Sequence, residues 1–234
     1  MKIQAIQKLT LLDFPGKTAA TVFTYGCNLR CPFCHNSSLV VDKSEGFIDE
    51  NEVYDLLEKR RGLLDGICIT GGEPLLQSDI IDFIKHVREM GFMVKLDTNG
   101  AFPDRLAPIL AEKLVNYVAM DVKNSPERYF AAVGIPGIDV SPFSRSIELI
   151  KSSGVDHEFR TTLVNGIHTK DDMVSIAKWI GPDSKYFIQM FVDSGDVLAN
   201  RSSESSLDAF SKSEAEDILA SVLEYNGNAK LRGV

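Results

Sequence analysis

The sequence predicts an α/β fold, a partial (β/α)6 TIM-like barrel built on a parallel sheet. Short apolar runs alternate with amphipathic stretches along the chain, which is typical of repeated βα units. Six of these runs are strand candidates, in 234 residues rather than the roughly 250 of a full eight-unit barrel. A doubly wound open sheet is the competing topology, because the pattern alone does not separate the two.

Strand and helix candidates alternate between residues 19 and 191. The expected strands are Ala19–Thr24, Gly66–Thr70, Met93–Asp97, Tyr117–Asp121, His157–Leu163 and Tyr186–Phe191. The expected helices are Glu50–Arg61, Asp79–Met90, Pro103–Lys113, Ser144–Ser153 and Lys170–Ile180. Three of these helices are followed by Gly91, Gly154 and Gly181, and glycine at that place commonly ends a helix.

One domain with a C-terminal extension is the expected organisation. The barrel domain is expected over residues 1–200. Arg201 to Ser206 is polar and predicts a linker, and Ser213–Tyr225 predicts a terminal helix. Residues 201–234 are therefore expected to extend the same domain.

Composition and charge exclude several classes of function. The chain has 25 basic and 33 acidic residues, a net charge of -8, so it offers no basic block to neutralise phosphates. This argues against a general binder of nucleic acids or membrane surfaces. No stretch approaches the roughly 18–20 apolar residues of a membrane span, and the N-terminus lacks an apolar signal core. We therefore expect a cytoplasmic protein with neither nucleic-acid nor membrane partners.

The main candidate for chemistry is a cysteine loop directly after the first expected strand. Cys27, Cys31 and Cys34 have the spacing C-x3-C-x2-C, so three thiolates can converge on one metal centre. In a reducing compartment such a group indicates metal rather than disulfides. A structural zinc site or a ferredoxin cluster needs four ligands, so three leave one position open.

A zinc site with three cysteines and one histidine is the alternative interpretation. His35 directly follows Cys34, which strains binding of both to one ion, but His157 or His168 offers a distant fourth ligand. The fourth cysteine, Cys68, lies inside an apolar stretch and is expected to be a small buried hydrophobic residue.

The loop also carries an aromatic residue, Phe33, directly before its last cysteine. C-x3-C-x-aromatic-C resembles the signature of the radical S-adenosylmethionine (SAM) superfamily. The resemblance implies that the three cysteines hold a [4Fe–4S] cluster and that SAM chelates its unique iron. It also implies that Phe33 packs near the adenine, and it makes the adjacent His35 a cofactor-binding candidate.

A second stretch, Gly71-Gly72-Glu73-Pro74, follows the next expected strand. Glycines let the backbone approach a ligand closely, although a plain βα turn has the same composition. Its place at the C-terminal end of a strand resembles the SAM-amino motif of the superfamily. By this resemblance all four residues are cofactor-binding candidates.

Polar residues also end the third and fourth expected strands: Asp97, Thr98 and Asn99, and then Asp121 and Lys123. Side chains at these ends face the mouth of an α/β barrel. A turn at Asn99 and a helix cap at Asp121 are the simpler alternatives. The stretches resemble those of glycyl-radical-enzyme activating enzymes. This implies SAM contacts, a monovalent cation near Asp97, Thr98 and Asp121, and a SAM or partner contact for Lys123.

Two later strands supply the last candidates. Arg160 is placed to reach the SAM carboxylate or ribose, or to pair with Glu158 or Asp156 at the rim. Gln189 occupies a place where some members of the family carry a SAM-contacting histidine, so it departs from their pattern.

The N-terminal stretch narrows the resemblance. Residues 6–17, together with Cys34-His35-Asn36, resemble the activating proteins of anaerobic ribonucleoside-triphosphate reductases, and the likeness extends to about residue 191. It makes Asp13 and Lys17 candidates for contact with the partner or the rim, while a turn at Pro15-Gly16 is the structural alternative.

The resemblance implies a specific reaction. SAM is cleaved reductively to methionine and a 5′-deoxyadenosyl radical, which abstracts hydrogen from a glycine of a partner glycyl radical enzyme. No side chain is expected to be catalytic beyond the cluster and SAM. The chain has no second cysteine cluster, so the electron is expected from a flavodoxin or ferredoxin.

Three alternatives remain beside activation of an anaerobic ribonucleotide reductase. The partner could be pyruvate formate-lyase. The chain could instead be a small-molecule radical SAM enzyme of the 7-deazapurine synthase type. A zinc-binding or electron-transfer protein without SAM chemistry is the third, and it leaves the strand-end stretches unexplained.

Overall fold

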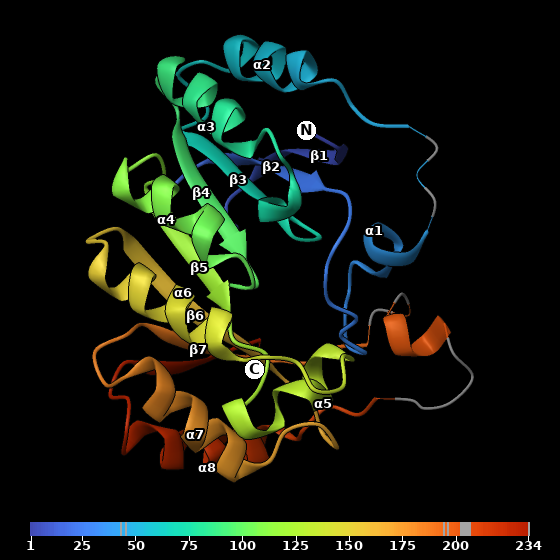
Figure 1. Cartoon of the computed structure of the whole chain (residues 1–234), viewed down its shortest axis with the longest axis vertical. Helices are drawn as coiled ribbons and strands as arrows, with labels where there is room; N and C mark the ends of the chain where they lie inside the picture. Colours follow the sequence, from blue (N-terminus) through green and yellow to red (C-terminus); the bar gives the residue numbers. More distant parts are fainter. Residues whose placement is uncertain (43, 45, 194, 196, 202–206, 234) are drawn as a thin grey trace.

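The computed structural model describes residues 1–42, 44, 46–193, 195, 197–201 and 207–233. Its centre is one eight-stranded sheet whose spatial order follows the chain, from β1 to β8 (Figure 1). β1 pairs with β2 in antiparallel orientation, and the pairs from β2 to β8 are parallel. A doubly wound sheet reverses its strand order, whereas this one does not. The expected partial barrel is therefore confirmed and the competing topology is excluded.

The strands match the predicted ones closely but exceed them in number. They are β1 Ile3–Thr10, β2 Ala19–Thr24, β3 Gly66–Gly71, β4 Met93–Thr98, β5 Tyr117–Asp121, β6 Asp156–Leu163, β7 Tyr186–Met190 and β8 Ala229–Arg232. The six predicted strands are confirmed to within one residue at each end. The two outermost strands, β1 and β8, were not predicted, so the sheet has one more parallel strand than expected.

The helices alternate with the parallel strands. They are α1 Ser37–Val41, α2 Glu50–Lys59, α3 Ile80–Glu89, α4 Pro103–Ala111, α5 Tyr129–Val133, α6 Ser141–Ser152, α7 Lys170–Ile180 and α8 Lys212–Leu223. Three short 3-10 turns are η1 Pro74–Leu76, η2 Pro126–Arg128 and η3 Leu198–Arg201. The predicted helices are confirmed with ends shifted by up to three residues, and α1 and α5 are additional.

Local sequence explains where the longer helices begin. α7 starts with a capping box in which Thr169 and Asp172 bond each other's backbone, and Ser211 and Glu214 do the same for α8. The Asp49 side chain accepts a bond from the backbone of Asn51 at the start of α2. These caps satisfy backbone donors that a helix start otherwise leaves unpaired.

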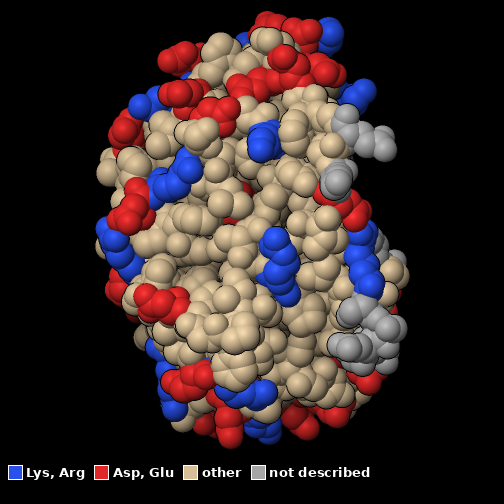
Figure 2. Space-filling model, turned by 45° about the vertical axis from the view of Figure 1, so that its right-hand side comes forward, with Lys and Arg blue, Asp and Glu red and all other residues tan. Residues whose placement is uncertain are grey.

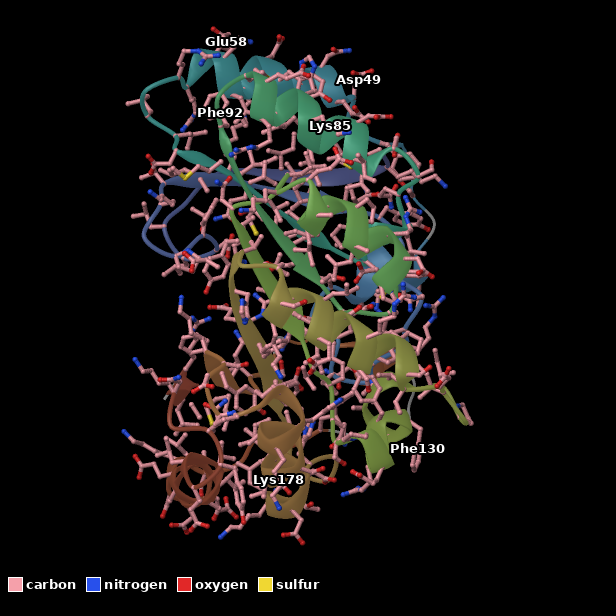
Figure 3. The ribbon with its side chains drawn as sticks, turned by 60° about the vertical axis from the view of Figure 1, so that its left-hand side comes forward. Asp49, Glu58, Lys85, Phe92, Phe130 and Lys178 are labelled. Carbon is pink, nitrogen blue, oxygen red and sulfur yellow. The ribbon has the colours of Figure 1, made fainter. Side chains whose placement is uncertain are left out.

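Most of the helices, namely α2, α3, α4, α6, α7 and α8, form one layer over the outer face of the sheet, whereas α1 and α5 lie apart from it, to the right in Figure 1. Figure 3 shows Glu58 on α2 and Lys178 on α7 at the outer surface of this layer, and both are exposed. Apolar side chains that alternate along the strands, such as Ile67 and Ile69, are fully buried. Because successive strand residues face opposite sides, the intervening Cys68 and Thr70 belong to the inner face. That inner face carries the polar residues described below.

The C-terminal part of the chain continues the sheet. Residues 202–206 of the predicted linker lie outside the described residues, and Arg201 ends η3. α8 packs against α7, and β8 then pairs with β7. The extension therefore adds a strand as well as the expected helix.

Surface charge is unevenly distributed. On the face shown in Figure 2, acidic side chains gather at the upper end of the molecule, and acidic and basic side chains are mixed at the lower end and along the left edge. The helices that the structure describes include none that is long and apolar enough to cross a membrane.

Candidate functional site

The carboxyl ends of the parallel strands and the cysteine loop enclose one cavity of about 250 Å³. Such an edge is where α/β barrels place their functional side chains. Its lining comes from the cysteine loop, from α1 and from β3, β4, β5, β6 and β7 with the residues that directly follow these strands. All the predicted site residues except Glu73 and Pro74 line it: Cys27, Cys31, Phe33, Cys34, His35, Gly71, Gly72, Asp97, Thr98, Asn99, Asp121, Lys123, Arg160 and Gln189.

The three cysteines form one side of this cavity, between β2 and α1. The backbone N–H of Cys34 donates to the carbonyl of Cys31 at 3.0 Å, and that of Leu29 donates to Cys27 Sγ at 3.4 Å. Burial raises the pKa of the Cys31 thiol to about 12 and also raises that of Cys27. Metal ligation requires thiolates, and burial removes the water that would stabilise their negative charge. A bound cationic centre would stabilise that charge instead.

Three thiols on one wall of a cavity fit an iron–sulfur cluster with one open iron position. Among the side chains that the structure describes, no three of His, Cys, Asp or Glu gather closely enough to hold a single metal ion. A cubane cluster makes less demand on convergence, because its cysteines bind different iron atoms.

The histidines do not complete a four-ligand zinc site. His168 is 3% exposed; its Nδ1 accepts the Val164 N–H at 3.1 Å and its Nε2 lies 2.8 Å from the Lys123 carbonyl. Both ring nitrogens are therefore engaged with the backbone. His157 Nδ1 lies 2.9 Å from the carbonyl oxygen of Val155, the residue before β6. His35 lines the cavity, with its ring centroid 5.6 Å from that of Phe191.

Gly71, the last residue of β3, and Gly72 let the backbone pass close to the segment from Thr24 to Gly26, which leads into the cysteine loop. A Cβ atom on Gly72 would lie 2.0 Å from the Gly26 carbonyl oxygen, and one on Gly71 would lie 2.5 Å from the Thr24 nitrogen. Hydrogen bonds join the same segments, with the Gly72 N–H donating to the Thr24 carbonyl at 2.9 Å. Any side chain here would separate the two walls of the cavity. A SAM-amino contact for this segment stays a prediction.

The structure places Glu73 and Pro74 behind the cavity wall rather than on it. Glu73 is fully buried; its Oε1 accepts from Thr98 Oγ1 at 2.8 Å and its Oε2 from the Asn99 N–H at 2.6 Å. Burial raises the pKa of its carboxyl to about 7, although these hydrogen bonds act in the opposite direction. Glu73 therefore fixes the turn after β4, and Pro74 begins η1.

Asn99 connects that turn to the cysteine loop. Its Nδ2 donates to Asn28 Oδ1 at 2.9 Å, while its Oδ1 accepts the Ala101 N–H at 2.9 Å. Gly100 has a φ of 80°, as expected of the turn alternative. The residue thus makes the turn and lines the cavity at once.

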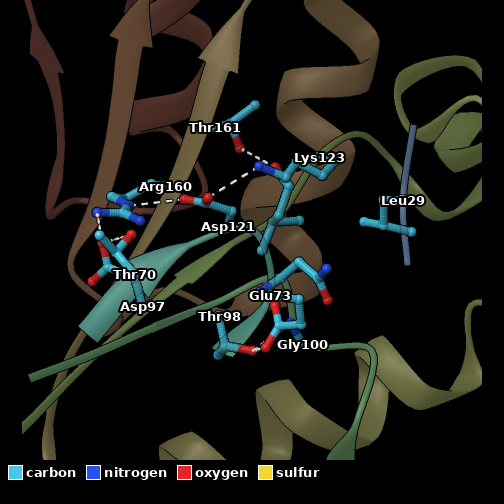
Figure 4. Close-up of polar contacts among 12 residues, drawn as sticks. Leu29, Thr70, Glu73, Asp97, Thr98, Gly100, Asp121, Lys123, Arg160 and Thr161 are labelled. Atoms are coloured by element: carbon cyan, nitrogen blue, oxygen red, sulfur yellow. Dashed lines mark hydrogen bonds and ion pairs between the residues drawn. The ribbon is translucent and has the colours of Figure 1, made fainter. Parts of the chain in front are cut away.

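The inner wall formed by the strand ends carries a charge cluster, which we define as Lys95, Asp97, Asp121, Lys123 and Arg160. Figure 4 labels its members other than Lys95. Asp121 pairs with Arg160 in the register of β5 and β6, so their side chains are cross-strand neighbours. Arg160 Nε donates to Asp121 Oδ1 at 2.8 Å, and its Nη1 donates to Asp97 Oδ2 at 3.1 Å. The guanidinium therefore bridges two carboxylates.

The outer members complete the cluster. Lys123 Nζ lies 3.0 Å from Asp121 Oδ2, and Lys95 Nζ contacts Asp97 Oδ1. Burial opposes the charged forms, but the opposite charges outweigh it. The charges of Arg160 and Lys123 hold the pKa of Asp121 below its usual range, and Asp121 in turn raises the pKa of both cations.

Two of the expected alternatives for this wall are not observed. Glu158, a predicted rim partner of Arg160, instead accepts from Arg232 at 2.9 Å and from the Tyr117 hydroxyl at 3.0 Å. Asp121 has both carboxylate oxygens bound within the charge cluster, so it does not act as a helix cap.

Sequence reasoning missed several residues of the site. Lys95 is 1% exposed and lies 3.7 Å from Cys68 Sγ, yet a lysine inside a strand carries no obvious signal. Its position two residues before Asp97 was the available clue, because alternate strand residues share a face. Lys95 itself does not line the cavity; the unpredicted residues of the lining are Leu29, Asn36, Val40, Thr70 and Thr162.

Comparison with known proteins identifies several curated relatives. A provisionally named glycyl-radical enzyme activating enzyme of Methanocaldococcus jannaschii is 35% identical over 193 residues, 81% of this chain and 79% of that protein. A 7-carboxy-7-deazaguanine synthase of Hyperthermus butylicus is 31% identical, covering 75% of this chain and 69% of the relative. A pyruvate formate-lyase-activating enzyme of Clostridium pasteurianum is 28% identical, covering 70% and 68%.

Solved structures support the fold. SuiB of Streptococcus suis, bound to its precursor peptide SuiA, superimposes with a TM-score of 0.67 at 15% identity, over 90% of this chain and 47% of that longer one. A sequence profile of the radical SAM superfamily matches residues 21–180, which include the cysteine loop and every strand-end residue of the cavity up to Arg160. This chain belongs to the radical SAM superfamily and is a radical SAM enzyme.

Proposed function

We propose that this enzyme generates a glycyl radical on a partner enzyme, and that the partner is an anaerobic ribonucleoside-triphosphate reductase. The observation that carries the activating function is the 35% identity to the Methanocaldococcus jannaschii relative, which extends over four fifths of this chain. The choice of reductase rests on the N-terminal stretch and on Cys34-His35-Asn36 alone.

Family membership implies a [4Fe–4S] cluster and SAM, and the cavity residues fit both. Cys27, Cys31 and Cys34 would hold the cluster, since their three thiols share one cavity wall. When bound, the cluster and SAM supply reductive cleavage and a 5′-deoxyadenosyl radical. The chain's own residues would bind, orient and shield these groups from water.

Each wall offers a different set of contacts to SAM. Phe33 is 3% exposed and presents an apolar ring near the cysteines, which suits an adenine. Gly71 and Gly72 also line the cavity, and their backbone suits an ammonium group. Lys123 and Arg160 carry positive charge that suits the SAM carboxylate. A flavodoxin or ferredoxin would supply the electron from outside.

The N-terminal stretch provides a surface for the partner. Leu11 and Leu12 are 67% and 90% exposed, directly after β1. Asp13 is held by Thr21, whose Oγ1 donates to Asp13 Oδ2 at 2.5 Å, so a role for this residue in packing the turn accompanies any contact with the partner.

Two other substrates have specific support. The relative from Clostridium pasteurianum favours pyruvate formate-lyase as the partner. The relative from Hyperthermus butylicus favours a small-molecule substrate of the 7-deazapurine type. Both alternatives share the cluster and SAM chemistry of the leading proposal. Only the substrate that reacts with the SAM-derived radical distinguishes the three candidate functions.

The test is an anaerobic assay in two stages. The protein is reconstituted with iron and sulfide, reduced with dithionite and given SAM, and 5′-deoxyadenosine is measured. We expect this product together with an absorption band from the cluster. No product from a protein that contains zinc instead of iron would overturn the SAM chemistry.

The second stage adds candidate substrates separately. We expect a glycyl-radical doublet in the electron paramagnetic resonance spectrum with the anaerobic ribonucleotide reductase. A doublet only with pyruvate formate-lyase would change the partner. Turnover only of a deazapurine precursor would overturn glycyl-radical activation.

A further inference from the structure

The inner wall of the cavity is where the resemblance to activating enzymes implies a bound monovalent cation, with Asp97, Thr98 and Asp121 as its ligands. A cation site needs oxygen atoms with free lone pairs that point into a common space. The contacts of these three side chains decide whether this chain offers them.

Each carboxylate oxygen of the two aspartates already contacts a cationic nitrogen. Asp97 Oδ1 contacts Lys95 Nζ, and Asp97 Oδ2 lies 3.1 Å from Arg160 Nη1. Asp121 Oδ1 lies 2.8 Å from Arg160 Nε, and Asp121 Oδ2 lies 3.0 Å from Lys123 Nζ. The Thr70 hydroxyl donates to Asp97 Oδ2 as well, at 3.3 Å.

The third expected ligand is turned elsewhere. Thr98 Oγ1 donates to Glu73 Oε1 at 2.8 Å and accepts the Gly100 N–H at 3.1 Å. Both bonds hold its oxygen in the turn after β4, although Thr98 lines the cavity. Figure 4 shows Thr98 directed to Glu73, apart from the Arg160 bridge.

Charge counting leads to the same result. The charge cluster contains three cations, Lys95, Lys123 and Arg160, and two carboxylates, those of Asp97 and Asp121. These five residues therefore carry an excess of one positive charge. The nearby Glu158 is paired with Arg232 and does not alter this balance. A further cation would therefore be repelled by the net positive charge of these five residues inside the barrel, where solvent screens charges least.

We propose that the guanidinium of Arg160, bound between Asp97 and Asp121, takes the place of the monovalent cation, so that this enzyme binds SAM without sodium or potassium. A guanidinium suits this position because it is permanently charged and its fixed nitrogens reach two carboxylates at once. This inference rests on the proposed function only in naming SAM as the ligand.

The first test measures SAM binding to the reconstituted protein by equilibrium dialysis. Sodium, potassium and tetramethylammonium chlorides are compared at one ionic strength. We expect dissociation constants that agree within about twofold, because tetramethylammonium is too large to enter a site between two carboxylates. A saturable tightening of about fivefold or more by sodium or potassium would overturn the inference.

The second test needs no SAM and removes the bridging charge. Arg160→Met leaves Asp97 and Asp121 with one lysine each, and Arg145→Met is its matched control, since Arg145 forms an exposed ion pair with Asp104. We expect potassium or sodium to raise the Tm of Arg160→Met by several degrees relative to tetramethylammonium. Wild type and Arg145→Met are expected to show no such difference.

The outcomes separate the two proposals. No SAM binding in any salt would count against the proposed function, while the Tm comparison would still decide the cation question. A wild-type Tm that rises specifically with sodium or potassium would overturn the replacement by Arg160. If Arg160→Met does not fold, the wild-type titrations by themselves still decide.

Discussion

The two walls of the cavity achieve their charge balance in opposite ways. The charge cluster on β4, β5 and β6 contains its own counterions, so every carboxylate oxygen of Asp97 and Asp121 has a cationic partner. The cysteine loop presents thiols whose burial raises the pKa of Cys27 and Cys31. The strand ends are thus arranged by the polypeptide alone, whereas thiolates in the loop would depend on the proposed cluster for their stabilisation. Mutations in the cysteine loop are therefore expected to reduce iron content and activity, and mutations in the charge cluster to reduce the stability of the fold.

The largest effect is expected from removing one of the three proposed cluster ligands. Cys31→Ala should eliminate the iron-dependent absorption and reduce 5′-deoxyadenosine formation at least about 100-fold, because two cysteines do not retain a cubane cluster. The sheet and the charge cluster do not depend on this thiol, so circular dichroism should be almost unchanged. Iron content, absorption and product are measured together.

Cys68→Ala is the matched control for this prediction. Cys68 is fully buried on β3, outside the cavity lining, and lies 3.7 Å from Lys95 Nζ. Its loss should reduce stability slightly and leave the iron content intact. Equal iron loss in both variants would contradict the assignment of the cluster to the loop.

A mutation in the charge cluster should instead lower the free energy of unfolding. Asp97→Asn leaves Lys95 buried without its carboxylate, and breaking a buried ion pair from one side costs about 3–5 kcal/mol of unfolding free energy. Asp104→Asn is the control, because its pair with Arg145 is exposed and such pairs contribute about 0–1 kcal/mol. Denaturant unfolding of both variants checks this, and similar losses in the two would contradict it.

Sequence reasoning succeeded where a pattern reports on one strand or one loop. The central strands other than β6 are short, mostly apolar runs, and their helix-covered face is buried as that pattern predicts. β1 was not predicted because most of its residues are polar or exposed and form no apolar run. β8 was not predicted because it has only four residues. Both lie at the edges of the sheet, where the neighbouring strand rather than the pattern determines pairing.

For the site, sequence could indicate which residues reach the cavity but not what they bind. Cysteine spacing and strand ends placed most candidates in the lining. The bridge from Arg160 to two aspartates depends on the register of β4, β5 and β6, which no single stretch encodes. Glu73 is a cofactor-binding candidate through the resemblance of its four-residue stretch to the SAM-amino motif, but its side chain is buried behind the cavity and bonded to Thr98 and Asn99.

The close approach of Gly72 to Gly26 tests whether SAM binding depends on the contact between the β3 end and the cysteine loop. Gly72→Ala would bring a methyl group to 2.0 Å from the Gly26 carbonyl oxygen, so the cysteine loop must shift. We expect a stability loss of about 2 kcal/mol, in the range for overpacked sites, and about tenfold weaker SAM binding. Gly227→Ala is the control, because nothing lies within 4 Å of its added Cβ. Unchanged SAM binding in Gly72→Ala would show that the walls act separately.

The smallest effect concerns Glu73, which supports both walls from behind. Burial raises the pKa of its carboxyl from an ordinary value of 4.5 to about 7, so the folded chain binds its proton more tightly than the unfolded chain does. Its favourable contribution is therefore complete below about pH 4.5 and is lost as the pH rises through about 7. Wild type should lose about 1–2 kcal/mol relative to Glu73→Gln between about pH 5.5 and 7.5.

Anaerobic denaturant titrations of both reconstituted proteins across this interval measure that difference, with the surface change Glu216→Gln as the control for removing a carboxylate. Glu73→Gln also loses an acceptor for the Asn99 or Leu75 N–H, but this cost does not vary with pH. It therefore shifts the whole curve without changing its slope. A constant gap between wild type and Glu73→Gln would mean that the three hydrogen bonds keep Glu73 ionised throughout. The turn behind the cavity would then be held by charge, as the strand-end wall is.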